Sequence, residues 1–153
     1  MKPNFNDNYK GIKCRVYMVR EGDADEVIKL SNSSDVYDLV KDELANSDRE
    51  MLLSVMVTSK NQLIGVETVS IGSISATSMA PREVFKSAIL ANAVGIILCH
   101  NHPSGELTPS NEDIQVTKLL VDAGELLGIK VLDHIIISNK GYHSLVDNLN
   151  SSN

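Results

Sequence analysis

One segment of the chain decides the fold, residues 94–113, which read VGIILCHNHPSGELTPSNED. Its first residues, Val94 to Cys99, are almost entirely apolar, which is typical of a central strand covered on both faces. Two prolines and a glycine within 103–109 then turn the chain sharply. Ser110 is a good helix N-cap and begins the longest helical pattern in the sequence. The segment therefore predicts a buried strand, a tight loop and a long helix.

Three side chains in this segment could hold a metal ion. Residues two apart on a strand point to one face, so His100 and His102 can present two imidazoles together. With Ser110 as N-cap, Asp113 lies in the first helical turn, where the helix dipole favours a carboxylate. Two histidines and one acid leave a fourth position for water, which is the arrangement of a catalytic zinc site. We therefore predict a metal centre in which zinc lowers the pKa of its water to about 7.

Two simpler interpretations stay open on the sequence alone. Asp113 can be an ordinary helix-terminal charge, and both histidines can be hydrogen-bonded polar residues at the edge of a loop. A His-x-His pair is weak evidence by itself, because four histidines place some pair two apart by chance about 8% of the time. The strand end, the turned loop and the capped helix carrying an acid raise the metal signal above that level.

Other reactive residues receive structural interpretations. Strand alternation turns Cys99 away from the histidines, so a small buried thiol is expected there. Asp133 and His134 lie inside a later strand, where a structural or outer-shell role is favoured over a rival ligand set. His143 follows a turn and is expected at the surface.

Periodicity and turn residues predict the remaining elements. A hairpin is expected where two apolar β-prone runs flank a polar turn. The mixture of hairpins and helices indicates an α/β or α+β layered domain with a mixed sheet. The predicted strands are 13–19, 51–58, 63–69, 94–99, 129–138 and 142–146, and the predicted helices are 34–45 capped by Ser34, 81–92 beginning at Pro81, and 110–127.

Length and composition favour one globular domain. The chain has 153 residues, of which 42% are hydrophobic, and it contains no internal repeat or Pro/Gly/Ser-rich linker. We predict a domain over 13–147 between a polar N-terminal tail, 1–12, and a polar C-terminal tail, 148–153. Both tails are expected to fray.

The charge balance argues against nucleic-acid and membrane partners. Fourteen Lys and Arg residues face twenty Asp and Glu residues, giving a formal net charge of −6, whereas phosphate binding needs a basic surface. The apolar runs are far shorter than the roughly 20 residues of a spanning helix. Cys14 and Cys99 cannot form a disulfide framework, so a soluble cytoplasmic protein is expected. The oligomeric state is left open, although an exposed strand edge would allow pairing.

The segment also carries a family resemblance. His100-x-His102, seven residues and then Ser110-x-x-Asp113 match the JAMM/MPN+ metalloprotease signature, and the string HNHPSG at 100–105 resembles the RadC-type JAB domain. The resemblance extends over 34–146. It includes four further short strings: Pro-Arg-Glu at 81–83, Asn-Ala at 92–93, Asp-His at 133–134 and Ser-Leu at 144–145. The resemblance implies a curved mixed β-sheet flanked by helices, the JAB/MPN fold with cytidine-deaminase-like layering.

The resemblance also implies roles for individual residues. It assigns one zinc ion per chain, and no other cofactor, to His100, His102 and Asp113. It gives Ser110 the role of holding the oxyanion or the zinc-bound water. A Glu on an early strand, after the first helix, would be the general acid/base. Glu50, just before the predicted strand 51–58, is the matching residue, with Glu67 and Glu83 as rivals.

By this resemblance the expected function is a zinc-dependent metallohydrolase, most simply a peptidase or isopeptidase. The substrate, whether a peptide, an isopeptide or a small amide, is not indicated by the sequence. A DNA-repair-associated nucleic-acid-binding protein, as the family name suggests, and a non-catalytic MPN scaffold are the alternatives. Many RadC proteins carry a helix-hairpin-helix segment ahead of this domain, and the roughly thirty residues before the first expected helix do not resemble one.

Overall fold

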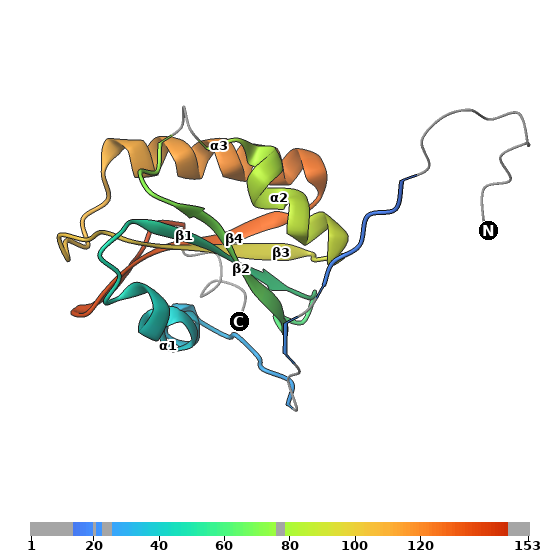
Figure 1. Ribbon diagram of the computed structural model, residues 1–153, viewed down its shortest axis with the longest axis horizontal. Coiled ribbons are helices and arrows are strands. Elements are labelled where there is room, and N and C mark those ends of the chain that lie inside the picture. The colour runs from blue at the N-terminus through green and yellow to red at the C-terminus, as the bar shows by residue number, and fades with distance from the viewer. Residues whose placement is uncertain (1–13, 20, 23–25, 76–78, 147–153) are drawn as a thin grey trace, which may run out of the picture.

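A five-stranded mixed sheet forms the middle of the molecule (Figure 1). The computed structural model describes residues 14–19, 21–22, 26–75 and 79–146. The strands lie in the order β2-β1-β3-β4-β5, and β3 and β4 are parallel while the other pairs are antiparallel. The elements of the described residues are α1 (Ser33–Leu44), β1 (Met51–Val57), β2 (Leu63–Ile71), α2 (Pro81–Leu90), β3 (Gly95–Asn101), α3 (Asn111–Leu127), β4 (Lys130–Ser138) and β5 (Gly141–Ser144).

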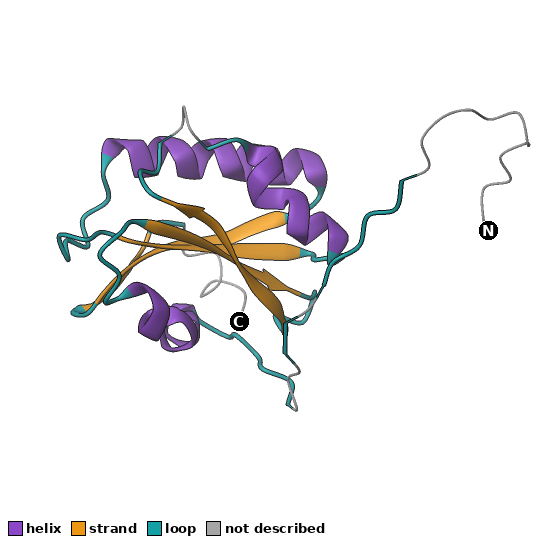
Figure 2. Ribbon diagram, in the orientation of Figure 1, coloured by secondary structure: helices purple, strands orange, loops and turns teal. Residues whose placement is uncertain are grey.

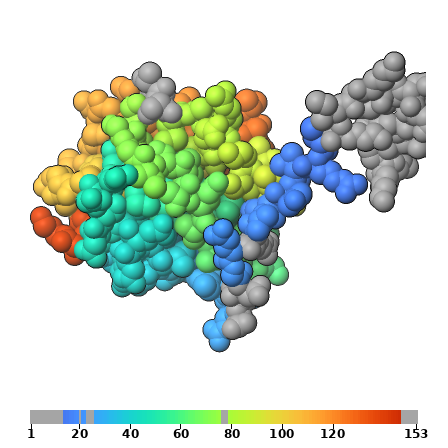
Figure 3. Space-filling view, viewed as in Figure 1, coloured from blue at the N-terminus to red at the C-terminus, as the bar shows by residue number. Residues whose placement is uncertain are grey.

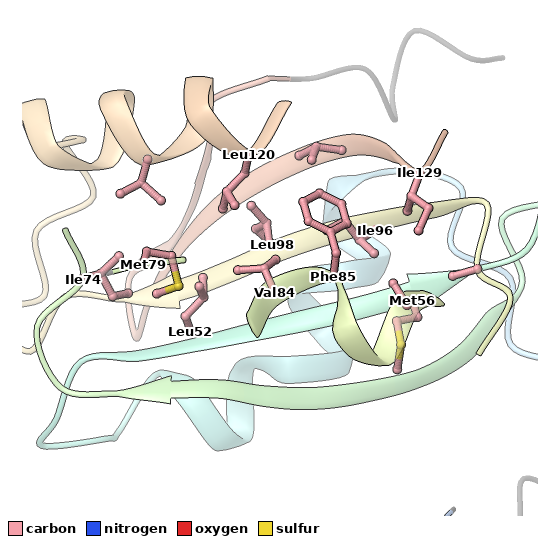
Figure 4. Packing of buried hydrophobic residues seen from close by; sticks show 14 residues of the cluster. Leu52, Met56, Ile74, Met79, Val84, Phe85, Ile96, Leu98, Leu120 and Ile129 are labelled. Carbon is pink, nitrogen blue, oxygen red and sulfur yellow. The ribbon is translucent and has the colours of Figure 1, made fainter. Parts of the chain in front are cut away.

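Helices cover both faces of the sheet, which confirms the predicted α/β class. Helices α2 and α3 lie on one face and α1 on the other (Figure 2). In the layer under α2 and α3, Leu98 of β3 belongs to the same buried cluster as Phe85 and Leu120 (Figure 4). In the layer under α1, Ile97 of β3 belongs to a second cluster with Val36. Every residue of β3 is therefore buried, as expected for a strand with apolar residues on both faces.

The central strand runs two residues further than its apolar pattern predicts. It ends at Asn101 rather than Cys99, because pairing with both neighbours continues past the apolar run. His100 pairs with Leu52 of β1 and with Ile136 of β4. The first predicted metal ligand is thus fixed inside a strand rather than on a loop.

Two helix boundaries differ from the predictions for local reasons. Asn32, not Ser34, is the N-cap of α1, because its side chain accepts a hydrogen bond from Asp35 N at 3.0 Å. Asparagine caps a helix as well as serine does. Helix α2 ends at Leu90 instead of residue 92, where Asn92 has a left-handed φ of 53° that cannot continue a helix.

The predicted strand over 13–19 is wrong for the residues that are described. Residues 14–19 form neither helix nor strand, and Val16, Tyr17 and Val19 are about three-quarters exposed. An alternating pattern makes a strand only where another strand offers hydrogen-bond partners. Lys13 and the predicted tails, 1–12 and 148–153, lie outside the described residues. No helix among the described residues is both long and apolar enough to cross a membrane.

Asp133 fastens α1 to the sheet. The carboxylate is fully buried and accepts hydrogen bonds from Ser33 Oγ at 2.8 Å and from Ser144 Oγ at 2.7 Å. It also accepts from the backbone N–H groups of His134 at 2.7 Å and Val146 at 3.3 Å. Asp133 thus has the structural role that its strand position suggested.

We expect Asp133→Ala to lower the free energy of unfolding by about 3 kcal/mol, because two hydroxyls and two backbone N–H groups lose this acceptor. Asp122→Ala, which removes an exposed acid of α3, is the matched control and should stay within about 0.5 kcal/mol of the parent. Urea unfolding of both variants measures the difference. Equal stabilities would show that this carboxylate does not hold α1 in place.

Candidate metal centre

The residues before β1, the end of β3 and the start of α3 meet at one end of the sheet (Figure 1). Because β1 and β3 are antiparallel, the last residues of β3 lie beside the residues that enter β1. The loop after β3 then leads into the start of α3 at the same end of the molecule. In the space-filling view this loop and the residues before β1 lie close together at one edge (Figure 3).

Four side chains that can ligate a metal converge at this end. Glu50, His100, His102 and Asp113 each offer one ligand atom, and these atoms lie within 4.8 Å of one another. His100 Nε2 is 2.9 Å from His102 Nε2 and 3.2 Å from Asp113 Oδ1. His102 Nε2 is 3.1 Å from Asp113 Oδ2. The structure therefore brings together the three predicted ligands and the predicted acid/base residue.

The loop after β3 orients the second histidine. His102 Nδ1 lies 2.9 Å from the carbonyl oxygen of Glu106, and a carbonyl can only accept a hydrogen bond. The turn is closed by Gly105, whose N–H donates to the His102 carbonyl at 2.8 Å and whose φ of 77° suits glycine. A neutral His102 therefore carries its hydrogen on Nδ1 and turns the lone pair of Nε2 toward His100 and Asp113.

Asp113 is fixed by a capping box at the start of α3. Its Oδ2 accepts from the Ser110 backbone N–H at 2.7 Å, and Ser110 Oγ accepts from the Asp113 N–H at 3.1 Å. Burial by itself would raise the pKa of Asp113, whereas the hydrogen bond from the Ser110 N–H favours the charged carboxylate and acts to lower that pKa. The carboxylate therefore serves the helix terminus and faces both imidazoles at the same time.

The donor set and its spacing fit a small divalent metal. Ligands about 2.0 Å from a tetrahedral ion lie about 3.3 Å from one another. The two histidine Nε2 atoms are 2.9 Å apart, and they lie 3.2 Å (His100) and 3.1 Å (His102) from Asp113 Oδ1 and Oδ2 respectively, all close to that value. Two imidazoles and one carboxylate also suit a first-row transition metal better than Mg²⁺ or Ca²⁺.

Glu50 stands at the rim of the centre, immediately before β1. Continuing the register of Leu52 with His100 by two residues places Glu50 across from His102. Its backbone carbonyl accepts from Gly72 N at 2.7 Å, and its Oε2 accepts from Ile74 N at 3.3 Å. The side chain is partly exposed, so it borders both the buried ligands and solvent.

Asn101 holds the segment that carries Glu50, a role that no sequence pattern predicts. This buried amide accepts from Met51 N at 2.8 Å and donates to the Arg49 carbonyl at 2.9 Å. Both contacts flank Glu50 directly. Only the pairing of β1 with β3 reveals the role of Asn101, because about fifty residues separate the partners in the sequence.

The two rival acids lie elsewhere. Glu67 on β2 accepts a hydrogen bond from Ser87 of α2. Glu83 is exposed in the first turn of α2, where the hydrogen bond with Lys86 lowers its pKa. Among the described residues, the cluster with the predicted ligands includes Glu50 and neither of these two.

The remaining histidines and Cys99 occupy separate positions. His134 Nε2 is 2.7 Å from His100 Nδ1, so His134 lies behind a ligand and outside the cluster. Burial lowers the pKa of His134 to about 3, which keeps this imidazole neutral at pH 7. Cys99 is buried in the layer under α1, where burial raises the pKa of its thiol. His143 is exposed on β5.

A family model described as the RadC-like JAB domain matches residues 30–150. A UPF0758 protein of Moorella thermoacetica is 50% identical over 116 residues, which cover 76% of this chain and 51% of the relative. A UPF0758 protein of Methanosarcina mazei is 47% identical over 119 residues, covering 78% and 52%. The chain thus spans about half the length of the curated relatives it matches.

We expect the metal-free protein to bind one divalent transition metal per chain, and His102→Ala to weaken that binding at least about 100-fold. His102 is preferred to His100 for this test because its side chain is 15% exposed rather than fully buried. His143→Ala, at an exposed histidine outside the cluster, should bind like the parent. Competition against a chromophoric chelator gives the affinities, and equal loss in both variants would contradict a site at this position.

Proposed function

Because the chain belongs to the family of RadC-like JAB domains, we propose that it is a zinc-dependent hydrolase that cleaves a peptide or isopeptide bond. One observation carries the proposal: the two histidines and Asp113 converge with the partly exposed carboxylate of Glu50 within 4.8 Å. A metal site of three protein ligands beside a further, partly exposed carboxylate is the arrangement of a hydrolase rather than of a structural metal site.

His100, His102 and Asp113 would hold one zinc ion per chain. Imidazole and carboxylate ligands in a three-residue set favour zinc among the available metals. When bound, zinc would supply Lewis acidity, which lowers the pKa of a water molecule and polarises the carbonyl of the scissile bond.

Glu50 is proposed to move the proton. Its Oε2 is restrained by the Ile74 N–H, and Asn101 holds the backbone on both sides of it. A carboxylate in this position can take a proton from the attacking water and deliver it to the leaving amine nitrogen. Amines are poor leaving groups until they are protonated, so the same residue would serve both halves of the reaction.

Ser110 is proposed to stabilise the charge that develops on the carbonyl oxygen. Its Oγ accepts from the Asp113 N–H, so the single hydroxyl hydrogen can be donated to another acceptor. The side chain is exposed at the start of α3, where a substrate could reach it. One such donor contributes roughly 3 kcal/mol to transition-state stabilisation.

We expect Glu50→Gln to lower turnover at least about 100-fold while zinc stays bound, because the amide keeps the size of the side chain but cannot accept the proton. Cleavage of a mixed peptide and isopeptide library, followed by mass spectrometry, measures turnover. Elemental analysis measures zinc in the same samples.

Glu67→Gln and Glu83→Gln are the matched controls, because both remove a carboxylate outside the cluster. Both should keep parental turnover. A normal rate in Glu50→Gln with a loss in either control would move the acid/base role to that residue. Stoichiometric zinc without any cleavage by the parent would instead favour a non-catalytic scaffold.

A further inference from the structure

A column of buried polar side chains runs behind His100. His100 on β3 and His134 on β4 are fully buried, and Thr117 on α3 is 8% exposed. His100 Nδ1 lies 2.7 Å from His134 Nε2, and His134 Nδ1 lies 2.5 Å from Thr117 Oγ1. The column ends at the carbonyl oxygen of Asp113, which accepts a hydrogen bond from Thr117 Oγ1 at 2.6 Å. It therefore begins and ends at two residues of the candidate metal centre.

The hydrogens along this column can be assigned by starting at the Asp113 carbonyl, which can only accept. Thr117 therefore donates its single hydroxyl hydrogen there. Toward His134 Nδ1 the hydroxyl oxygen can then only accept, which places the hydrogen of a neutral His134 on Nδ1. His134 Nε2 must in turn accept, so the hydrogen of His100 lies on Nδ1. The lone pair of His100 Nε2 is thereby turned toward Asp113 and His102.

We propose that Thr117 and His134 are positioning residues that lock His100 in the tautomer required for metal binding, and that tie its orientation to Asp113 through α3. The inference rests on the proposed function in so far as it concerns the same metal centre. It adds two residues that touch neither metal nor substrate. Partners of this kind behind a ligand typically account for about 10- to 100-fold in metal affinity.

A neutral acceptor suits the charge of this centre. A metal-bound histidine commonly donates its second N–H to a carboxylate or a backbone carbonyl. Here the acceptor is a buried imidazole, and the nearby acid, Asp133, points to the opposite layer. The formal charges of Asp113 and Glu50 already balance one divalent cation, so a further buried carboxylate would leave the site negative.

Removing the Thr117 hydroxyl should allow His134 and His100 to adopt their other tautomers. Without that acceptor, His134 can place its hydrogen on Nε2 and donate it to His100 Nδ1. A neutral His100 must then carry its own hydrogen on Nε2, where it blocks the lone pair that would ligate a metal. Binding would require both imidazoles to change tautomer, at a cost in affinity.

The test compares Thr117→Val, which keeps the shape of the side chain, with Thr117→Ser, which restores the hydroxyl. We expect Thr117→Val to bind zinc about 10- to 100-fold more weakly in chelator competition, and Thr117→Ser to recover most of the loss. Parental affinity in Thr117→Val, with the fold intact by circular dichroism, would overturn the proposal. So would an equal loss in both variants.

A second pair tests the other member of the column and covers a failure of Thr117→Val to fold. His134→Gln offers an amide oxygen that can accept from His100 Nδ1, whereas His134→Leu offers none. We expect His134→Gln to bind zinc more tightly than His134→Leu. Equal affinities would overturn the proposal.

The tautomers are read directly by long-range ¹H–¹⁵N correlation spectra of the metal-free parent. We expect the hydrogen on Nδ1 in both His100 and His134, and a hydrogen on Nε2 of His134 would contradict the column. This measurement needs no metal and no substrate. If the parent binds no zinc or cleaves nothing, the proposed function is wrong. The spectra then still decide whether the tautomer assignment is correct.

Discussion

Three ligand atoms that accept hydrogen bonds face one another at the end of β3, and the fold must hold them there. With both imidazoles in the tautomers set by their partners, two lone pairs and a carboxylate lie 2.9–3.2 Å apart. Such atoms repel each other unless a cation lies between them. Strand pairing fixes His100, a carbonyl fixes His102, and the capping box fixes Asp113. Each restraint uses backbone groups: those of the paired strands for His100, of the loop for His102 and of the helix terminus for Asp113.

A shift in the register of β4 decides which side chains support this arrangement. Ile96 pairs with Val131, but Ile97 pairs with Asp133, so Leu132 is an extra residue on β4. Such a bulge reverses the alternation of every residue that follows it. Asp133 therefore faces α1 instead of α3, and His134 faces the metal centre.

The sequence predicts the parts of this architecture that local chemistry determines. Apolar periodicity identifies β3 and α3, and Ser110 is the N-cap that its position predicts. The spacing of the two histidines and Asp113 correctly places them together. Long-range contacts were not predictable in the same way. Asn101 contacts residues about fifty positions away, and the face of His134 depends on a bulge that no local pattern marks.

Asp133 and His134, which are neighbours on β4, face opposite layers and have different roles. Asp133 is a charged acceptor where hydroxyl and N–H donors surround it, and it joins α1 to the sheet. His134 is a neutral acceptor for His100, in the layer that also holds Asp113 and Thr117. Exchanging the two faces would bury a carboxylate behind a metal site whose formal charges already balance, and would leave the donors around α1 with a weaker acceptor. The bulge at Leu132 therefore determines which of these two side chains lies behind His100.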